Sequence, residues 1–184
     1  MGFVEKRYFK NKNGNTFVVR TALPKEAKKI LMFNQEIIRE APYLVTTAEE
    51  FQLTIDQERR LLKEMMDDNG KLAIIAEYQD CIIGFLDFHN GPKKRLMHQG
   101  AFGMSVGEKH RNQGVGNALL TVLLDWTKEN PLIEKVCLEV VANNKNAISL
   151  YEKYGFYKEG HKCKAIKVDD KTYYDLISMA LLMN

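Results

Sequence analysis

A polar turn containing three glycines occupies residues 106–118, which read VGEKHRNQGVGNA, between an apolar stretch and an amphipathic helical pattern. The first amides of a helix have no intrahelical partners, and together with the helix dipole they form an anion site. Gly114 and Gly116 leave that site without side chains, and Arg111 adds a positive charge. Each glycine inside a helix costs about 0.5–1 kcal/mol relative to alanine. This cost favours phosphate binding over the alternative, in which the glycines only permit close helix packing.

Two common phosphate-binding loops are absent from the sequence. The chain has no G-x-x-x-x-G-K-[ST] stretch, so a nucleoside triphosphatase loop is not supported. It also lacks an early G-x-G-x-x-G within a βαβ unit, which a dinucleotide-binding fold requires. A nucleotide-binding protein of another kind stays an alternative, and it predicts thermal stabilisation by ATP but not by coenzyme A.

A second segment, residues 144–156, reads NKNAISLYEKYGF. It resembles the N-x-x-A-x-x-L-Y-x-x-x-G-F segment of the GNAT superfamily of N-acetyltransferases, and residues 111–116 resemble that superfamily's R/Q-x-x-G-x-G/A signature. The resemblance is strong over residues 72–156, and residues 156–183 look like the closing strands. It implies transfer of an acetyl group from acetyl-CoA to a primary amine by direct attack in a ternary complex. The acceptor stays open: a small molecule, a polyamine, an amino acid or a protein N-terminus.

The resemblance also implies which residues hold the cosubstrate. The pyrophosphate is expected on the turn and helix start, and the pantetheine arm on the backbone of the preceding strand, where residues 103–105 are smaller than is usual in the family. Asn144 either binds the pantetheine or only caps a helix, for which asparagine is favoured. The full expected set is Met104, Ser105, Val106, Arg111, Asn112, Gln113, Gly114, Val115, Gly116, Asn117, Asn144, Ala147 and Tyr151.

Three residues are candidates for the chemistry. The resemblance implies that Tyr151 is the general acid that protonates the departing thiolate, although Tyr151 and Tyr154 also fit a core role. The amine must lose a proton before it attacks, which calls for a base. His98, at the expected start of the preceding strand, and Glu139, on the next strand, are the two candidates. A covalent cysteine intermediate is not favoured, because Cys137 lies in an apolar strand and the other cysteines have no evident basic partner.

The fold class expected is α/β (α+β), a GNAT-type acyltransferase fold in one domain, residues 1–184. The family resemblance implies a mixed sheet of about seven strands and about four helices. Apolar periodicity predicts strands at 17–21, 72–78, 82–88, 96–106, 136–141, 156–164 and 173–183. Helices are expected from Pro24, from Thr46 or Thr47, over 111–128 and over 144–154.

The composition is that of an ordinary globular domain: 184 residues, 28% of them charged, with a net charge of +3. This mild charge indicates neither a nucleic-acid nor a membrane partner. Three scattered cysteines and four scattered histidines suggest no metal site, and a cytoplasmic location is expected. Members of the resembling family are often homodimers, commonly through their terminal strands. Two further alternatives are a transferase using another acyl-CoA and a CoA-binding regulatory module without catalysis.

Overall fold

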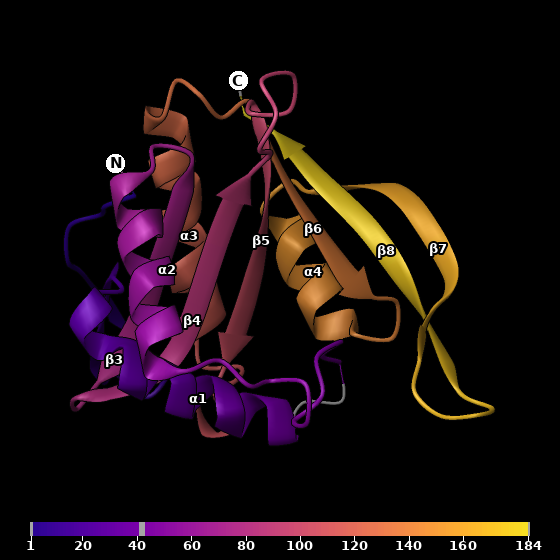
Figure 1. Cartoon of the computed structure of the whole chain (residues 1–184), viewed down its shortest axis with the longest axis horizontal. Coiled ribbons are helices and arrows are strands. Elements are labelled where there is room, and N and C mark those ends of the chain that lie inside the picture. The colour runs from indigo at the N-terminus through magenta and orange to yellow at the C-terminus, as the bar shows by residue number, and fades with distance from the viewer. Residues whose placement is uncertain (1, 41–42, 184) are drawn as a thin grey trace.

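The computed structural model describes residues 2–40 and 43–183, and its centre is one mixed sheet in the order β1-β2-β3-β4-β5-β6-β8-β7 (Figure 1). The strands are β1 (Arg7–Lys10), β2 (Thr16–Thr21), β3 (Lys71–Tyr78), β4 (Cys81–Asn90), β5 (Gln99–Val106), β6 (Lys135–Val141), β7 (Tyr157–Lys167) and β8 (Tyr173–Leu182). The α-helices are α1 (Ala27–Glu40), α2 (Ile55–Asp67), α3 (Val115–Glu129) and α4 (Lys145–Lys153), with short 3-10 helices η1 (Pro24–Glu26) and η2 (Glu108–His110).

The sheet divides between β5 and β6, its only parallel pair among the described strands. Their register holds from Gln99 opposite Lys135 to Ala101 opposite Cys137 and goes no further. β5 nevertheless continues to Val106, paired on its other side with β4. Figure 1 shows the two strands together at one end and apart at the other. The fold therefore leaves a split in the sheet beside the second half of β5.

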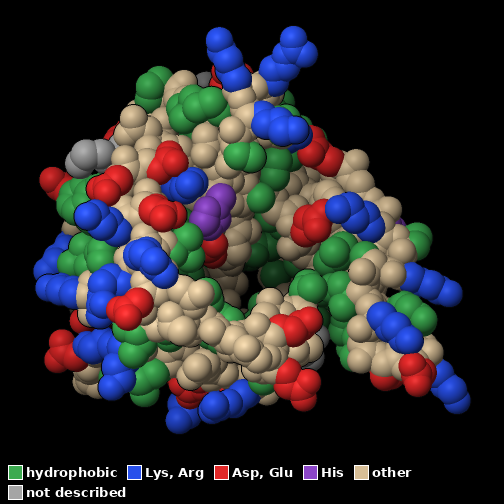
Figure 2. Space-filling view, viewed as in Figure 1, with side chains coloured by type: hydrophobic (Ala, Val, Ile, Leu, Met, Phe, Trp, Pro, Cys, Tyr) green, Lys and Arg blue, Asp and Glu red, His purple; other side chains and the backbone are tan. Residues whose placement is uncertain are grey.

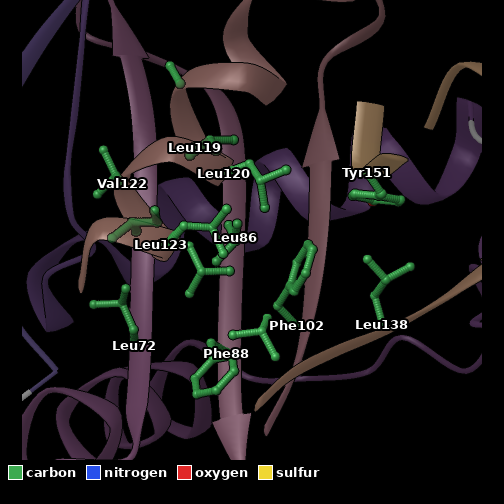
Figure 3. Packing of buried hydrophobic residues seen from close by; sticks show 14 of the residues in the cluster. Leu72, Leu86, Phe88, Phe102, Leu119, Leu120, Val122, Leu123, Leu138 and Tyr151 are labelled. Carbon is green, nitrogen blue, oxygen red and sulfur yellow. The ribbon is translucent and has the colours of Figure 1, made fainter. Parts of the chain in front are cut away.

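Two apolar layers cover the two faces of the sheet. Helices α3 and α4 pack on one face, where Leu86, Phe102, Leu119 and Leu138 belong to the larger buried cluster (Figure 3). Helices α1 and α2 pack on the other face, against Ala73 and Ile75 among others. Because side chains alternate along a strand, the odd-numbered residues of β4, β5 and β6 that flank these core positions face the α1–α2 side. This alternation decides below which side chains share one face of the split.

Local turn chemistry explains most of the element boundaries. Gln79 and Asp80 both have positive φ, 49° and 62°, as the two central residues of a tight hairpin turn require. Gly155 ends α4 in the left-handed region at φ 89°. These features account for the β3–β4 hairpin and for the end of α4, next to the expected strands 72–78 and 82–88 and the expected helix 144–154.

The expected start of the second helix at Thr46 or Thr47 is wrong. Thr47 does form capping contacts with Glu50, but only a turn follows there. The helix begins at Ile55, because Thr54 and Gln57 repeat the same capping pattern just before a stripe that packs on the sheet. The buried residues of that stripe are Glu58, Leu62 and Met65.

Eight strands replace the seven expected, because the four-residue β1 joins the edge of the sheet. Its side chains are mostly exposed and carry little apolar signal, so periodicity does not reveal it. β5 starts at Gln99, three residues after the expected Leu96. Among residues 2–40 and 43–183, no helix combines the length and the apolar character needed to cross a bilayer.

Arg20 joins three elements near the N-terminal edge of the sheet. Its guanidinium donates to Glu26 of η1, with Nη2 to Oε1 at 2.6 Å, and to Glu77 of β3, with Nε to Oε2 at 2.9 Å. All three side chains are mostly buried. We expect Arg20→Ala to lower the free energy of unfolding in urea by about 3 kcal/mol, because it leaves two poorly solvated carboxylates without a cation.

The matched control is Arg7→Ala, whose ion pair with Asp125 is well exposed and should contribute less than about 1 kcal/mol. An equal effect of the two substitutions would contradict this account of Arg20.

Candidate active site

The split in the sheet exposes one edge of β5. Beyond Ala101 no described residue of β6 pairs with β5, so the backbone of Met104, Ser105 and Val106 lines the opening. An unpaired strand edge can accept an extended ligand through main-chain hydrogen bonds. Figure 2 shows a deep hollow in the middle of this face of the molecule, with acidic and histidine side chains near its rim. The expected pantetheine residues therefore lie on an accessible edge.

The glycine turn lies at the far end of β5. Gly114 is the N-cap of α3 and has φ 95°, a conformation that L side chains rarely adopt, and Asn112 also has positive φ. No side chain caps the helix at Gly114. Chains of amides in such alternating conformations form anion-binding concavities. The turn thus presents a helix start whose amide groups no described side chain covers.

Neither glycine is required by packing within the protein. A Cβ at Gly114 would have no neighbouring atom within 4 Å, and one at Gly116 would lie at ordinary contact distance, 3.4 Å, from Leu150. Gly116 thus lies in α3 at a position where the surrounding side chains would tolerate the methyl group of an alanine. These distances count against close helix packing as the reason for the two glycines, and they leave the phosphate interpretation standing.

Side-chain contacts hold the turn in place. Arg111 donates from Nε to the carbonyl of Val106 at 3.1 Å. Gln113 donates from Nε2 to the Lys109 carbonyl at 2.7 Å and accepts from Asn11 at 3.2 Å, so it fixes the turn to the β1–β2 loop. The Gln113 side chain is therefore a structural anchor, and Arg111 brings its charge next to the end of β5.

The remaining expected cosubstrate residues surround the start of α3 and α4. Asn144 accepts a hydrogen bond from the Ala147 amide at 3.2 Å, so it does cap α4. Val115 is buried in the core, where only its backbone can meet a ligand. Asn117 accepts at its side-chain oxygen from Lys153 at 3.4 Å, which places another cation near the turn.

Tyr151 projects from α4 into the apolar wall of the split. It is 8% exposed, and its ring lies 5.8 Å from that of Phe102 on β5 and 5.9 Å from that of Phe156. In Figure 3, Tyr151 and Leu138 of β6 lie on one side of β5, and Leu86 lies on the other side. Burial raises the pKa of Tyr151 to about 12. The phenol therefore stays protonated at any physiological pH, as a proton donor must.

The two expected bases lie away from Tyr151. His98 stands just before β5, where its carbonyl accepts from the amides of Glu134 and Lys135 at 2.7 and 3.1 Å, at the closed end of the split. Four residues of strand, about 13 Å, separate it from Phe102. Glu139 lies on the open part of β6 but on the opposite face from Leu138, ion-paired with Lys162 and accepting from Ser178. The structure does not bring the three residues together.

The sequence reasoning missed an acidic group on the α1–α2 face. Glu58 of α2 is buried, and desolvation together with the charge of Asp87 raises its pKa. Asp87 of β4 is 2.9 Å from His89 Nε2 and lies opposite Gly103 in the β4–β5 register. The available signal was a glutamate in phase with the apolar residues of α2 and an aspartate inside an apolar strand.

Side chains of β4 approach both Gly100 and Gly103 of β5 closely. A Cβ at Gly100 would collide with the ring of Phe88, so packing excludes a side chain there. A Cβ at Gly103 would lie 3.1 Å from Asp87 Oδ1, which shows that the carboxylate leans over this residue.

The expectation that the histidines and cysteines are scattered is wrong at one place. The β7–β8 hairpin brings His161, Cys163 and Asp175 together, with donor atoms within 4.8 Å of one another. His161 Nε2 is 2.8 Å from Asp175, whose other oxygen accepts from the Lys164 amide. Cys163 therefore has a histidine nearby, and Asp175 makes both contacts through its side-chain carboxylate, where the β7–β8 register is irregular.

Comparison with known proteins shows what this arrangement resembles. The sequence model of the acetyltransferase (GNAT) family matches residues 33–156. An L-amino acid N-acetyltransferase of Escherichia coli is 28% identical over 98 residues, which cover 53% of this chain and 60% of that enzyme, less than two thirds of its length. A spermidine N(1)-acetyltransferase of Vibrio cholerae is 25% identical over 133 residues, 71% of this chain and 75% of that enzyme.

The fold is also found among solved structures. An acetyltransferase of the GNAT family from Streptococcus pneumoniae superposes with a TM-score of 0.87 at 23% identity, covering 91% of this chain and 99% of that one. This structural similarity supports the fold assignment. The two enzymes with similar sequences are named for different acceptors, an L-amino acid and spermidine.

Proposed function

The chain belongs to the acetyltransferase (GNAT) family of acetyl-CoA-dependent N-acetyltransferases, and we propose that its acceptor is a primary amine that enters the split from the α1–α2 face. The observation that carries this proposal is the geometry of β5. Its free edge, Met104–Val106, leads from the anion-binding turn at residues 111–116 to the ring of Tyr151. A thioester held at one end by its diphosphate would reach Tyr151 at the other.

The residues of the turn would hold the diphosphate through backbone amides and the Arg111 charge. Pantetheine would add to the edge of β5 as a short strand. Asn144 has already used its carbonyl oxygen for the helix cap, which leaves its amide donor for the cosubstrate. The chain's own residues would thus bind and aim acetyl-CoA, with its acyl group directed toward the split in the sheet.

The transfer needs one proton removed and one supplied. The neutral amine attacks the thioester carbonyl, the carbon–sulfur bond breaks, and Tyr151 donates its phenolic proton to the thiolate. After the attack the nitrogen carries an extra proton, which must leave on the acceptor side, and the Tyr151 phenolate then regains a proton from solvent. Among the bases suggested by sequence, Glu139 lies beside the open split and is neutralised by Lys162, whereas His98 lies at the closed end.

A thiol-release assay with acetyl-CoA and a panel of amines tests the proposal. Amine-dependent release is expected, with the acetylated amine detected by mass spectrometry. Thermal stabilisation by coenzyme A but not by ATP is expected in parallel. Stabilisation without release with any amine would instead favour a regulatory CoA-binding module, and faster release from succinyl-CoA would assign another donor.

We also propose a cytoplasmic homodimer that pairs through β7. This edge strand is exposed along nearly all of its eleven residues, and an unpaired strand edge is a template for association. Sedimentation velocity tests the assembly, and a monomer at every protein concentration used would overturn it.

A further inference from the structure

Glu58 is a buried acid without a partner. It is 3% exposed, and its carboxyl makes no hydrogen bond or ion pair with any residue among 2–40 and 43–183. It lies on the stripe of α2 that faces the sheet, one turn before Leu62. A buried carboxylate is normally paired, because desolvation of an unpaired charge is costly. Glu58 therefore departs from what stability alone would select.

Asp87 supplies a second carboxylate on the same face. The charge of Asp87 contributes to the raised pKa of Glu58, so the two groups interact electrostatically. His89 occupies one oxygen of Asp87, and the other leans over Gly103. Lys71, which lies opposite His89 in the register, is already paired with Asp68. The two acids thus lie on the α1–α2 side of the sheet, and no lysine or arginine among the described residues is shown to neutralise them.

The two acids lie beside the part of β5 that is not paired with β6. Gly103 is the second residue of β5 beyond the last pair with β6, and its neighbour Phe102 contacts Tyr151 on the other face. The acids and Tyr151 therefore stand at the same level of β5 on opposite faces of the sheet. A thioester in the split would meet Tyr151 at its leaving sulfur and the acids on the side from which the amine arrives.

We propose that Glu58 and Asp87, beside Gly103, bind the ammonium group of the acceptor and thereby select amines that carry no carboxylate next to the reacting nitrogen. This proposal rests on the proposed function. Two carboxylates attract an ammonium and repel an adjacent carboxylate in this partly desolvated site. The substrate class is thus an amine such as a polyamine or a peptide N-terminus, and a free α-amino acid is disfavoured.

Matched acceptors test the substrate class. Thiol release is measured with tyramine against tyrosine and with L-alaninamide against L-alanine, compared at equal concentrations of free base. The fastest acceptor is expected to lack the carboxylate and to exceed its partner in kcat/KM at least tenfold. A faster carboxylated partner would overturn the inference. No release with any acceptor would instead count against the proposed function.

The variants Glu58→Gln and Asp87→Asn test the residues, with the fastest acceptor. Each should lower kcat/KM for the amine at least tenfold, reduce the preference over the carboxylated partner, and leave the KM for acetyl-CoA within about twofold. Glu64→Gln, an exposed position on the same helix, is the matched control and should behave as wild type. Unchanged preference in both variants would overturn the inference.

A stability measurement separates this role from a structural one. Since the pKa of Glu58 is raised, its ionised form destabilises the folded state above its ordinary pKa, and glutamine removes that cost. We expect the Tm of Glu58→Gln at neutral pH to equal or exceed that of wild type. A lower Tm together with an unchanged acceptor preference would assign Glu58 to structure.

Discussion

Replacing Tyr151 with phenylalanine is expected to lower kcat about 100-fold, because a positioned proton donor typically contributes about 10²- to 10⁴-fold. The KM for acetyl-CoA should stay within a factor of about three, since the ring and its contacts with Phe102 and Phe156 are retained. Stopped-time product assays across acetyl-CoA concentrations measure both constants. The loss is expected at the low end of the range because thiolates leave readily.

The raised pKa of Tyr151 decides the size of this effect. With Tyr151 at about 12 and a free thiol near ~8.5, proton transfer to the thiolate is uphill by about 5 kcal/mol. The same apolar wall raises the pKa of a thiol bound in the split, because burial disfavours its charged form as well. The difference between the pKa values of Tyr151 and the bound thiol is therefore smaller in the split than in water. Ionisation of Tyr151 itself should cause no alkaline decline in kcat below about pH 11.

Tyr154 provides the matched control for Tyr151. Its hydroxyl donates to the Asn117 carbonyl at 3.0 Å and is 2.9 Å from Thr121, so it joins α4 to α3. Tyr154→Phe should lower the free energy of unfolding by about 1 kcal/mol and leave kcat within about threefold. Equal kcat values for the two variants would remove Tyr151 from the proton-transfer step.

The candidate cosubstrate residues that belong to continuous sequence motifs could be predicted from the sequence. Residues 111–116 and 144–156 are local patterns, and in the structure the first lies between β5 and the start of α3 while the second forms α4 and its two ends. The glycine stop after α4 and the β3–β4 turn were also predictable, because each depends on the backbone preference of one or two residues. Thr54 shows the limit: two similar capping patterns compete, and only tertiary packing selects the second.

The acidic group on the α1–α2 face was not predictable in this way. Glu58 and Asp87 are 29 positions apart and meet only because α2 packs against the sheet at a particular register. Sequence periodicity identifies Glu58 as a charged residue within the apolar stripe of α2, but it does not identify the residues that the Glu58 side chain faces. His98, chosen because its spacing from Val106 matches a strand, falls just outside β5. Side-chain partners across elements therefore required the structure.

The substitution Gly116→Ala should have opposite effects on stability and on cosubstrate binding. The new methyl group would lie at ordinary contact distance from Leu150, and alanine is the better helix former, so the Tm should stay equal or rise slightly. The same methyl group would occupy the space through which a phosphate approaches the backbone. We expect the KM for acetyl-CoA to rise about 10- to 100-fold, equivalent to about 1.4–2.8 kcal/mol of binding free energy.

Gly155→Ala separates this loss from a general effect of removing a glycine. Gly155 has φ 89° and lies after α4, so alanine there should cost about 1 kcal/mol or more of stability and leave the KM unchanged. The two variants thus predict a crossed pattern: one impairs binding without unfolding, the other destabilises without impairing binding. If Gly116→Ala instead lowered the Tm and kept the wild-type KM, the glycine would serve helix packing, and the diphosphate would have to be held elsewhere.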